Sequence, residues 1–150
     1  MSTTPDPRQR AWARFVTAQA MLLERIEATL ARHELPSLAW YDVLWILESA
    51  DGGRLRMNDL ARKAVISRSN VTRLTDRMEK AGLVVRADCP EDGRGTTCSL
   101  TDAGRKMRAR MWPVYRGQIN ALFGSQINAH EAASLVEMLE RIIEHLREQP

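Results

Sequence analysis

The sequence predicts a mainly α-helical fold with a small β-hairpin, of the winged helix-turn-helix class. A short helix around residues 60–64 is followed, after a tight turn, by a second helix that Ser67 caps. Two strands, at residues 83–86 and 97–100, enclose a charged loop rich in Pro and Gly. Long amphipathic helices flank this segment on both sides. At 150 residues, the chain fits one domain with a hydrophobic core.

The segment before the short helix predicts two helices and a brief strand. Between residues 9 and 31, apolar side chains recur at helical spacing and predict a long amphipathic helix. Pro36 disfavours helical backbone at the residue before it, and a second, Ser-capped helix follows over 38–49. Leu55 and Met57 flank a charged residue and predict a brief strand that joins the hairpin in a small sheet.

The second helix of the helix-turn-helix has two chemically different faces. Val71, Leu74 and Met78 recur at helical spacing and anchor it on the core, and Gly82 is its expected C-terminal cap. The opposite face carries side chains suited to hydrogen-bonding base edges and phosphates in a DNA major groove. The residues predicted to contact the major groove are Ser67, Arg68, Ser69, Asn70, Thr72, Arg73 and Arg77.

Side-chain chemistry divides these major-groove residues into two roles. Arg68 and Arg73 are expected to pair with guanine and Asn70 with adenine, because these side chains make bidentate contacts with those bases. The other four are expected to hold phosphates, which sets the register without reading sequence. For any single residue, an ordinary solvated helix face is the alternative interpretation.

Two more helices are predicted after the hairpin. Thr101 is the expected N-cap of a long helix, in which Pro113 removes one backbone hydrogen bond and predicts a kink. Asn128 and Glu131 form a capping-box pattern at the start of a last helix with a wide apolar stripe.

The apolar stripes near the two termini predict a homodimer. They are more than one small winged domain needs to cover itself, and burying them against a second copy is worth about 25 cal/mol per Å². The alternative is that both helices pack on their own domain. The residues predicted at the dimer interface are Trp12, Phe15, Leu135, Leu139, Ile142, Ile143 and Leu146.

The distribution of charge indicates binding to a polyanion. The net charge is +3, but residues 54–110 hold fourteen Lys and Arg against seven Asp and Glu, whereas the rest of the chain holds eight against twelve. An ordinary solvated surface is the alternative, because segregation along the chain need not produce one charged face.

The composition predicts a cytoplasmic protein without a metal, a cofactor or a membrane partner. Hydrophobic content is 44% and charged content 27%, no apolar run approaches a membrane span, and the first residues lack a signal peptide. Cys89 and Cys98 are expected as free thiols, with a cross-hairpin disulfide or a redox switch as the alternative. Together with His33, His130 and His145 they show no zinc-ligand spacing.

The segment NDLARKAVISRSNVTRLTDRMEKAGLVVR, with PEDGRGTTCSLTDAG after it, resembles the MarR (multiple antibiotic resistance regulator) family of bacterial transcription factors. The resemblance includes the wing pattern of an Asp, one residue, an Arg and then a strand ending in Leu-Thr, and it covers nearly the whole chain. It implies a single six-helix domain over 1–150 that dimerises. About residues 8–35 and 102–149 then form the dimerisation helices, and about 37–101 the winged DNA-binding part.

The resemblance also implies roles for the wing. Asp92 matches the wing acid of the family and is interpreted as orienting Arg94 by an ion pair, with a loop cap as the alternative. Arg94 is expected in the minor groove or on its phosphate rim. The family often has a second Arg directly after this Asp, but here Gly93 intervenes, so weaker wing affinity is expected.

Members of the family often bind small aromatic acids or phenols in a cleft between the dimer helices and the winged part. The residues expected to line such a cleft are Trp12, His33, Trp40, Trp45, Arg110, Met111 and Tyr115. For Trp40, Trp45 and Met111 the alternative is a place in the core, and for Arg110 a solvated surface.

The preferred function is therefore a ligand-responsive, homodimeric repressor that binds a pseudo-palindromic double-stranded DNA operator. An oxidation-responsive regulator that uses Cys89 and Cys98 is one alternative, although peroxide sensors of this family usually carry the reactive Cys in the first helix, which has none here. A helical interaction module without DNA binding is another. An enzyme is not expected, because the chain has no phosphate-binding Gly loop and no recognisable nucleophile motif.

Overall fold

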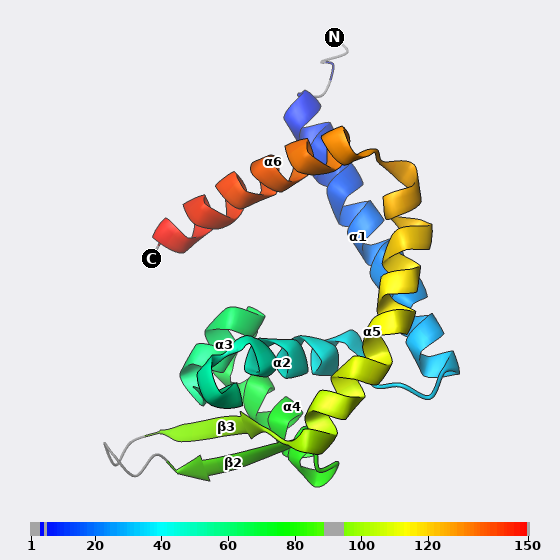
Figure 1. The fold of residues 1–150 in the computed structure, drawn as a ribbon. Helices are drawn as coiled ribbons and strands as arrows, with labels where there is room; N and C mark the ends of the chain where they lie inside the picture. Colours follow the sequence, from blue (N-terminus) through cyan, green and yellow to red (C-terminus); the bar gives the residue numbers. More distant parts are fainter. Residues whose placement is uncertain (1–3, 5, 89–94, 150) are drawn as a thin grey trace. The chain divides into compact units, whose positions relative to one another are not determined.

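The computed structural model describes residues 4, 6–88 and 95–149. These residues form six α-helices and a small antiparallel sheet, which is the predicted fold class (Figure 1). The elements are α1 (Pro7–Arg32), α2 (Leu38–Ser49), η1 (Asp51–Gly53), β1 (Arg54–Arg56), α3 (Met57–Ala64), α4 (Arg68–Lys80), β2 (Val84–Asp88), β3 (Thr96–Leu100), α5 (Asp102–Leu122), η2 (Gly124–Gln126) and α6 (Ala129–Glu148).

The chain divides into two units by its internal contacts. Residues 27–115 form one unit, which we call the winged unit. Residues 1–26 and 116–150 form the other, which we call the terminal-helix unit. Helices α1 and α5 each contribute to both units, so the division does not follow helix boundaries.

The core of the winged unit lies between α2, α3, α4 and the sheet. Val43, Leu44 and Leu47 of α2 are fully buried, as their helical spacing predicts. In the sheet the order is β1-β3-β2, and β3 pairs antiparallel with both neighbours. Cys98 at the centre of β3 lies opposite Leu55 on one side and Arg86 on the other, and its side chain is buried.

Two predicted strand boundaries are wrong by one or two residues, because residues expected in the strands belong to the ends of neighbouring helices. Met57 begins α3 instead of ending β1, and its side chain is 2% exposed in the core. Leu83 lies outside β2 because its N–H donates to the Met78 carbonyl at 3.0 Å, while Gly82, at φ 79°, donates to Glu79. This pair of bonds is the Schellman termination that the predicted Gly82 cap requires.

The start of α5 is fixed on the end of α4. The Thr101 hydroxyl donates to the Gly82 carbonyl at 2.7 Å and accepts the Gly104 N–H at 3.0 Å, which confirms the predicted N-cap. Helix α5 runs on through Pro113 to Leu122. The kink predicted at Pro113 stays a prediction.

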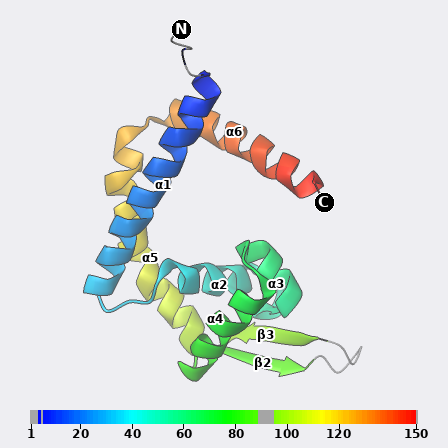
Figure 2. The same ribbon diagram turned by 180° about the vertical axis from the view of Figure 1, so that it is seen from behind.

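In the terminal-helix unit, the first turns of α6 lie beside the N-terminal half of α1 (Figures 1 and 2). Asn128 and Glu131 form the predicted capping box at the start of α6. No side chain of α6 is fully buried in the described chain, and Ile142 and Leu146 are 54% and 63% exposed. A groove of about 270 Å³ separates α1 from α6 and the end of α5. It is lined by Phe15, Ala18, Gln19, Leu22, Leu23, Ile26, Ile119, Phe123, Leu135 and Leu139.

The described residues lack two kinds of feature. None of the helices that they form is long and apolar enough to cross a membrane. Within the same residues, no group of three or more His, Cys, Asp or Glu side chains could hold a metal ion.

Candidate nucleic-acid interface

The start of α4 is shaped by a side-chain cap. Ser67 has extended backbone, with φ −66° and ψ 154°, and its hydroxyl oxygen accepts the N–H of Asn70 at 3.2 Å. The cap satisfies one of the N–H groups that every helix leaves unpaired at its beginning. The first turn of α4 is thereby fixed, and the side chains of Arg68, Ser69 and Asn70 are exposed on it.

The exposed face of α4 gathers the predicted major-groove residues. Ser67, Arg68, Ser69, Asn70, Thr72, Arg73 and Arg77 are all exposed. Thr72 is engaged locally, because its hydroxyl donates to the Arg68 carbonyl at 2.9 Å and lies 3.4 Å from the Arg68 guanidinium. No ion pair forms on Arg68, Arg73 or Arg77 within the described residues, so these three cations remain available to an external anion.

The opposite face anchors α4. Val71, Leu74 and Met78 are buried, as predicted, and Thr75 is buried beside them. The Thr75 hydroxyl donates to the Val71 carbonyl at 2.8 Å, so its burial leaves no unpaired donor. The sequence did not predict Thr75 in the core, because a search for apolar side chains at helical spacing passes over a polar residue on the same face as Val71 and Met78.

The turn between α3 and α4 contains a strained residue. Val65 caps α3 in the left-handed region at φ 56°, and its side chain is 88% exposed. A β-branched residue is unusual in this conformation, which Gly and Asn adopt more readily. The Ile66 N–H donates to the Ala61 carbonyl at 3.1 Å and closes the turn.

Arg86 of β2 joins the wing to α4, and sequence reasoning missed it. Its backbone N–H donates to Glu79 Oε2 at 2.7 Å, and its guanidinium lies 3.1 Å from Glu79 Oε1 and 3.0 Å from Asp76 Oδ1. A third contact reaches the Thr72 carbonyl at 3.4 Å. The available signal was the pair of acids three residues apart on α4, followed by a lone Arg in the next strand.

The pKa values of this cluster follow from those contacts. Hydrogen bonds from Lys80 and then Arg86 hold the pKa of Asp76 below its usual value, and the backbone and side chain of Arg86 do the same for Glu79. Burial alone would lower the pKa of Arg86, but the bonds to Glu79 and Asp76 raise it. All three groups are therefore charged at neutral pH, as an ion-pair cluster requires.

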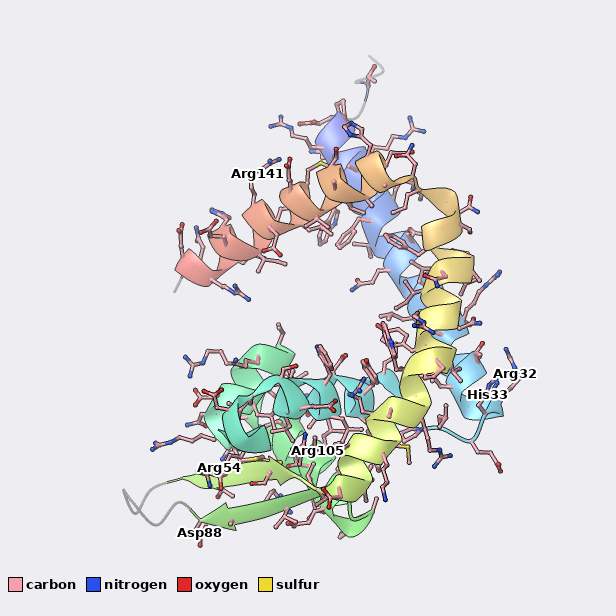
Figure 3. The ribbon with its side chains drawn as sticks, viewed as in Figure 1. Arg32, His33, Arg54, Asp88, Arg105 and Arg141 are labelled. Atoms are coloured by element: carbon pink, nitrogen blue, oxygen red, sulfur yellow. The ribbon has the colours of Figure 1, made fainter. Side chains whose placement is uncertain are left out.

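The wing is described up to its last strand pair, Asp88 with Thr96, and Figure 3 marks Asp88 at the free end of β2. The predicted wing residues Asp92 and Arg94 lie outside the described residues, as does Cys89.

Cys98 is a free thiol that is poorly suited to redox sensing. Burial raises the pKa of Cys98 to about 11. The thiolate is the form that reacts with oxidants, so this side chain is almost entirely in its unreactive form at neutral pH.

The residues predicted to line an effector cleft differ in exposure. Met111 is fully buried, Trp40 and Tyr115 are half-buried, and Trp12, His33, Trp45 and Arg110 are exposed. His33 is engaged with the Thr29 carbonyl, 2.9 Å from its Nδ1. The Arg108 guanidinium lies 5.3 Å from the centre of the Trp45 ring, and Arg108 also pairs with Glu48.

An aromatic cluster in the winged unit includes Tyr115 and two residues that sequence reasoning did not select. Tyr41 of α2 lies 5.0 Å from Tyr115 and 6.2 Å from Trp112, between ring centres. Burial, and then the charge of Asp42, raise the pKa of Tyr115. Burial also raises the pKa of Asp42, followed by repulsion from Glu27, although Asp42 keeps an exposed surface. The cluster therefore joins aromatic rings to an acidic edge.

These features define a class of protein. The second helix of a helix-turn-helix is capped, exposes a basic face, buries its other face in the core, and is tied to a β-hairpin by an Arg-carboxylate cluster. This is the arrangement of winged helix-turn-helix proteins.

Comparison with known proteins gives the family. The model of the MarR family matches residues 35–95. Streptomyces coelicolor AbsC, a MarR family transcriptional regulator, is 30% identical and superposes with a TM-score of 0.88 over 99% of this chain and 100% of AbsC. Sco3205 from the same organism, a MarR family regulator solved in complex with DNA, is 30% identical, with a TM-score of 0.89 over 99% and 95%.

A curated relative agrees. The transcriptional repressor IacR of Pseudomonas putida is 29% identical over 137 residues, which are 91% of this chain and 75% of IacR. The chain belongs to the MarR family of transcriptional regulators, as its sequence indicated. The family and these relatives are regulators of transcription and not enzymes, which confirms the prediction on that point.

Proposed function

We propose that this protein is a homodimeric repressor that binds a pseudo-palindromic double-stranded DNA operator and is released by a small aromatic or phenolic effector. The observation that carries the proposal is the exposed face of α4, where Arg68, Asn70 and Arg73 lie opposite the buried anchor and the two arginines form no ion pair with any described residue. Arg reads guanine and Asn reads adenine through bidentate hydrogen bonds in the major groove. The DNA complex of Sco3205, a protein with the same fold, supports the choice of ligand.

Affinity is proposed to come from phosphate contacts beside these base contacts. Ser67, Ser69, Thr72 and Arg77 lie on the same face of α4 and fix its register on the duplex. Arg94 of the wing extends the contact to the minor groove or its rim, with Asp92 beside it. Such binding releases counterions and weakens steeply with salt.

The dimer is proposed from the terminal-helix unit. Trp12 and Phe15 of α1 and Ile142, Ile143 and Leu146 of α6 leave large apolar surfaces exposed, while Leu135 and Leu139 line the adjoining groove. An exposed apolar surface of this extent marks an interaction site in a soluble chain. Two-fold pairing would place two α4 helices about 34 Å apart, one turn of DNA, which suits a palindrome.

The effector is proposed to contact the residues predicted for the cleft, with the aromatic cluster of the winged unit as its best-defined part. Tyr41, Trp112 and Tyr115 offer ring faces, and no Arg or Lys pairs with Asp42 in the described residues. Because Glu27 and Asp42 already repel each other, this part suits a neutral phenol better than a carboxylate anion. An effector releases DNA only if it binds the non-DNA-binding conformation better. The name of IacR, a repressor, supports repression as the direction of control.

The test of DNA binding is a fluorescence-anisotropy titration of the full-length protein with its own upstream intergenic DNA and with a scrambled duplex, at several salt concentrations. We expect a specificity ratio of about 10³ or more. Arg73→Ala should remove about 1–3 kcal/mol from specific binding, whereas Arg94→Ala should weaken both duplexes and lower the salt slope by about 1. Arg141→Ala is the matched control, because it removes the same charge from an exposed position of α6 (Figure 3). Equal binding of both duplexes by the wild-type protein at every salt concentration would contradict the proposal.

The dimer is tested separately by sedimentation velocity. Ile142→Glu changes a side chain that is 54% exposed in the isolated chain, so the fold should tolerate the charge, but the dimer should dissociate. Arg141→Glu, at the neighbouring position on the polar face of α6, should remain dimeric. A wild-type protein that sediments as a monomer would leave the apolar stripes without their proposed partner.

A further inference from the structure

Arg86 is the described residue with the densest set of polar contacts in the winged unit. From β2 it reaches Glu79 with both its backbone N–H and its guanidinium, at 2.7 and 3.1 Å, and Asp76 at 3.0 Å. Its side chain is only 20% exposed. The fixed strand and the helix are thus connected through one planar group, which moves only if several charge-assisted hydrogen bonds break.

The two carboxylates lie next to the surface proposed to contact DNA. At 100° per residue, Asp76 is 60° around α4 from Arg73, and Glu79 is one step further toward the sheet. Unpaired carboxylates at these positions would repel a phosphate backbone that approaches the exposed face. Lys80 pairs with Asp76 at 3.2 Å, but among the described residues only Arg86 pairs with both acids.

The position of Arg86 in the strand links this cluster to the wing. Arg86 is two residues before Asp88, the last residue of β2, and it pairs in register with Cys98 of β3. Residues paired across antiparallel strands project from the same face of the sheet, so Arg86 and the fully buried Cys98 both lie on the face that packs against α4. The core holds this face through Cys98, and the bonds to Asp76 and Glu79 hold it through Arg86. Together these contacts set the direction of the hairpin relative to α4.

We propose that Arg86 is a positioning residue for DNA recognition: it fixes the wing strand against α4 and neutralises the two carboxylates beside the DNA-contacting face. Arg86 does not itself touch DNA in this role. It sets the spacing between α4 and the wing, so that both can engage one half-site together. The DNA part of this inference depends on the proposed function.

The geometry requires Arg at this position. Three nitrogens of the guanidinium are engaged: Nη2 donates to Asp76 and Glu79, Nη1 to the Thr72 carbonyl, and Nε to Glu79. The five N–H donors of Arg are arranged in a rigid fork that reaches all of these acceptors. A Lys ammonium is a point charge with its donors on one atom, so it could replace the Nη2 contacts at most and would lose those that Nε and Nη1 make to Glu79 and to the Thr72 carbonyl. The Arg86→Lys variant therefore separates the effect of the positive charge from the effect of the guanidinium geometry.

The experiment compares Arg86→Lys and Arg86→Gln with wild type, and uses Arg141→Gln as the control that loses the same charge in α6 (Figure 3). The first measurement is amide hydrogen exchange of the full-length protein without DNA. We expect about tenfold faster exchange in β2 and in the C-terminal half of α4 for both Arg86 variants, while α2 and α6 are unchanged. Unchanged exchange in β2 and α4 would overturn the clamp.

The second measurement is the ratio of operator to scrambled-duplex affinity at a temperature where every variant is folded. A residue that only stabilised the fold would leave this ratio unchanged once folding is complete. We expect about a tenfold lower ratio for both Arg86 variants. In the Arg86→Gln background, Arg94→Ala should cause little further loss of operator affinity, because the wing is already misplaced. A ratio equal to wild type in Arg86→Lys would overturn the requirement for geometry, and additive losses in the double variant would overturn the coupling to the wing. If wild type itself shows no preference for the operator, the proposed function fails and takes the DNA role of Arg86 with it, while the exchange result still decides the clamp.

Discussion

Replacing Gly104 by Ala should destabilise the winged unit strongly, although Ala is the better helix former. Gly104 is buried in α5, where the helix passes the residue that precedes β2. A Cβ at this position would clash with the Leu83 carbonyl oxygen and would lie 2.6 Å from Leu100 Cδ1. The Leu83 oxygen cannot withdraw freely, because it accepts the Thr101 N–H at 3.1 Å.

The size of the effect follows from opposing contributions. Overpacking of a core costs about 1–3 kcal/mol, and weakening the Leu83–Thr101 hydrogen bond adds about 1 kcal/mol. The higher helix propensity of Ala returns about 1 kcal/mol. We therefore expect a net loss of about 2 kcal/mol in the free energy of unfolding, or about 4–8 °C in Tm for a chain of this length.

The assay is urea unfolding followed by circular dichroism at one fixed protein concentration, because association would make the midpoint depend on concentration. The control lies in the same helix. A Cβ on Gly117 would meet nothing within 4 Å, so Gly117→Ala should raise stability by about 0.5–1 kcal/mol. If Gly104→Ala were as stable as Gly117→Ala, the close approach of α5 to Leu83 would be refuted.

Three further changes test other features of the winged unit. Val65→Asn should raise the free energy of unfolding by about 1 kcal/mol in urea titrations, because Asn relieves the left-handed strain at φ 56° and the Val side chain, 88% exposed, loses no packing; a lower stability would argue against that conformation. In a Cys89→Ser variant at pH 8, iodoacetamide should alkylate Cys98 at least about 100-fold more slowly in the native protein than in urea. The reason is that burial raises the pKa of Cys98 from 9.0 to about 11. Similar rates in both states would contradict the burial of this thiol. Because contacts in the folded protein lower the pKa of Glu79, its charge stabilises the fold fully above the ordinary value of 4.5, and this stabilisation is lost as the pH falls through the pKa of the folded state. The free energy of unfolding, measured from pH 7 to 3, should therefore fall more for wild type than for Glu79→Gln. Parallel curves would show that the ion pair does not stabilise the fold.

The local elements were largely predictable, because short-range chemistry decides them. The Ser67 cap, the Asn128 capping box and the Gly82 termination each depend on residues within five positions of one another, and all three are present. The buried face of α4 followed equally from helical spacing. The errors lie at the edges of elements, as at Met57, where a core position and a first helical turn outweigh a pattern of alternation.

The candidate site was predictable on one side only. Spacing along α4 identified the exposed basic face, but it could not identify Arg86, whose partners lie seven and ten residues away in another element. The same limit explains why Tyr41 and Trp112 were not selected with Tyr115, since α2 and α5 bring these rings together across about seventy residues of sequence.

The sequence by itself determined the fold class, the N-terminal caps of α4, α5 and α6, and the family, because these depend on residue type and on short sequence spacings. Only the tertiary structure decided which charges are neutralised and which remain free. Arg86 and Arg73 are indistinguishable by type, yet one is enclosed by two carboxylates and the other stands exposed on α4. An ion pair depends on the distance between two groups in space, and spacing along the chain predicts that distance only within a single helix or strand.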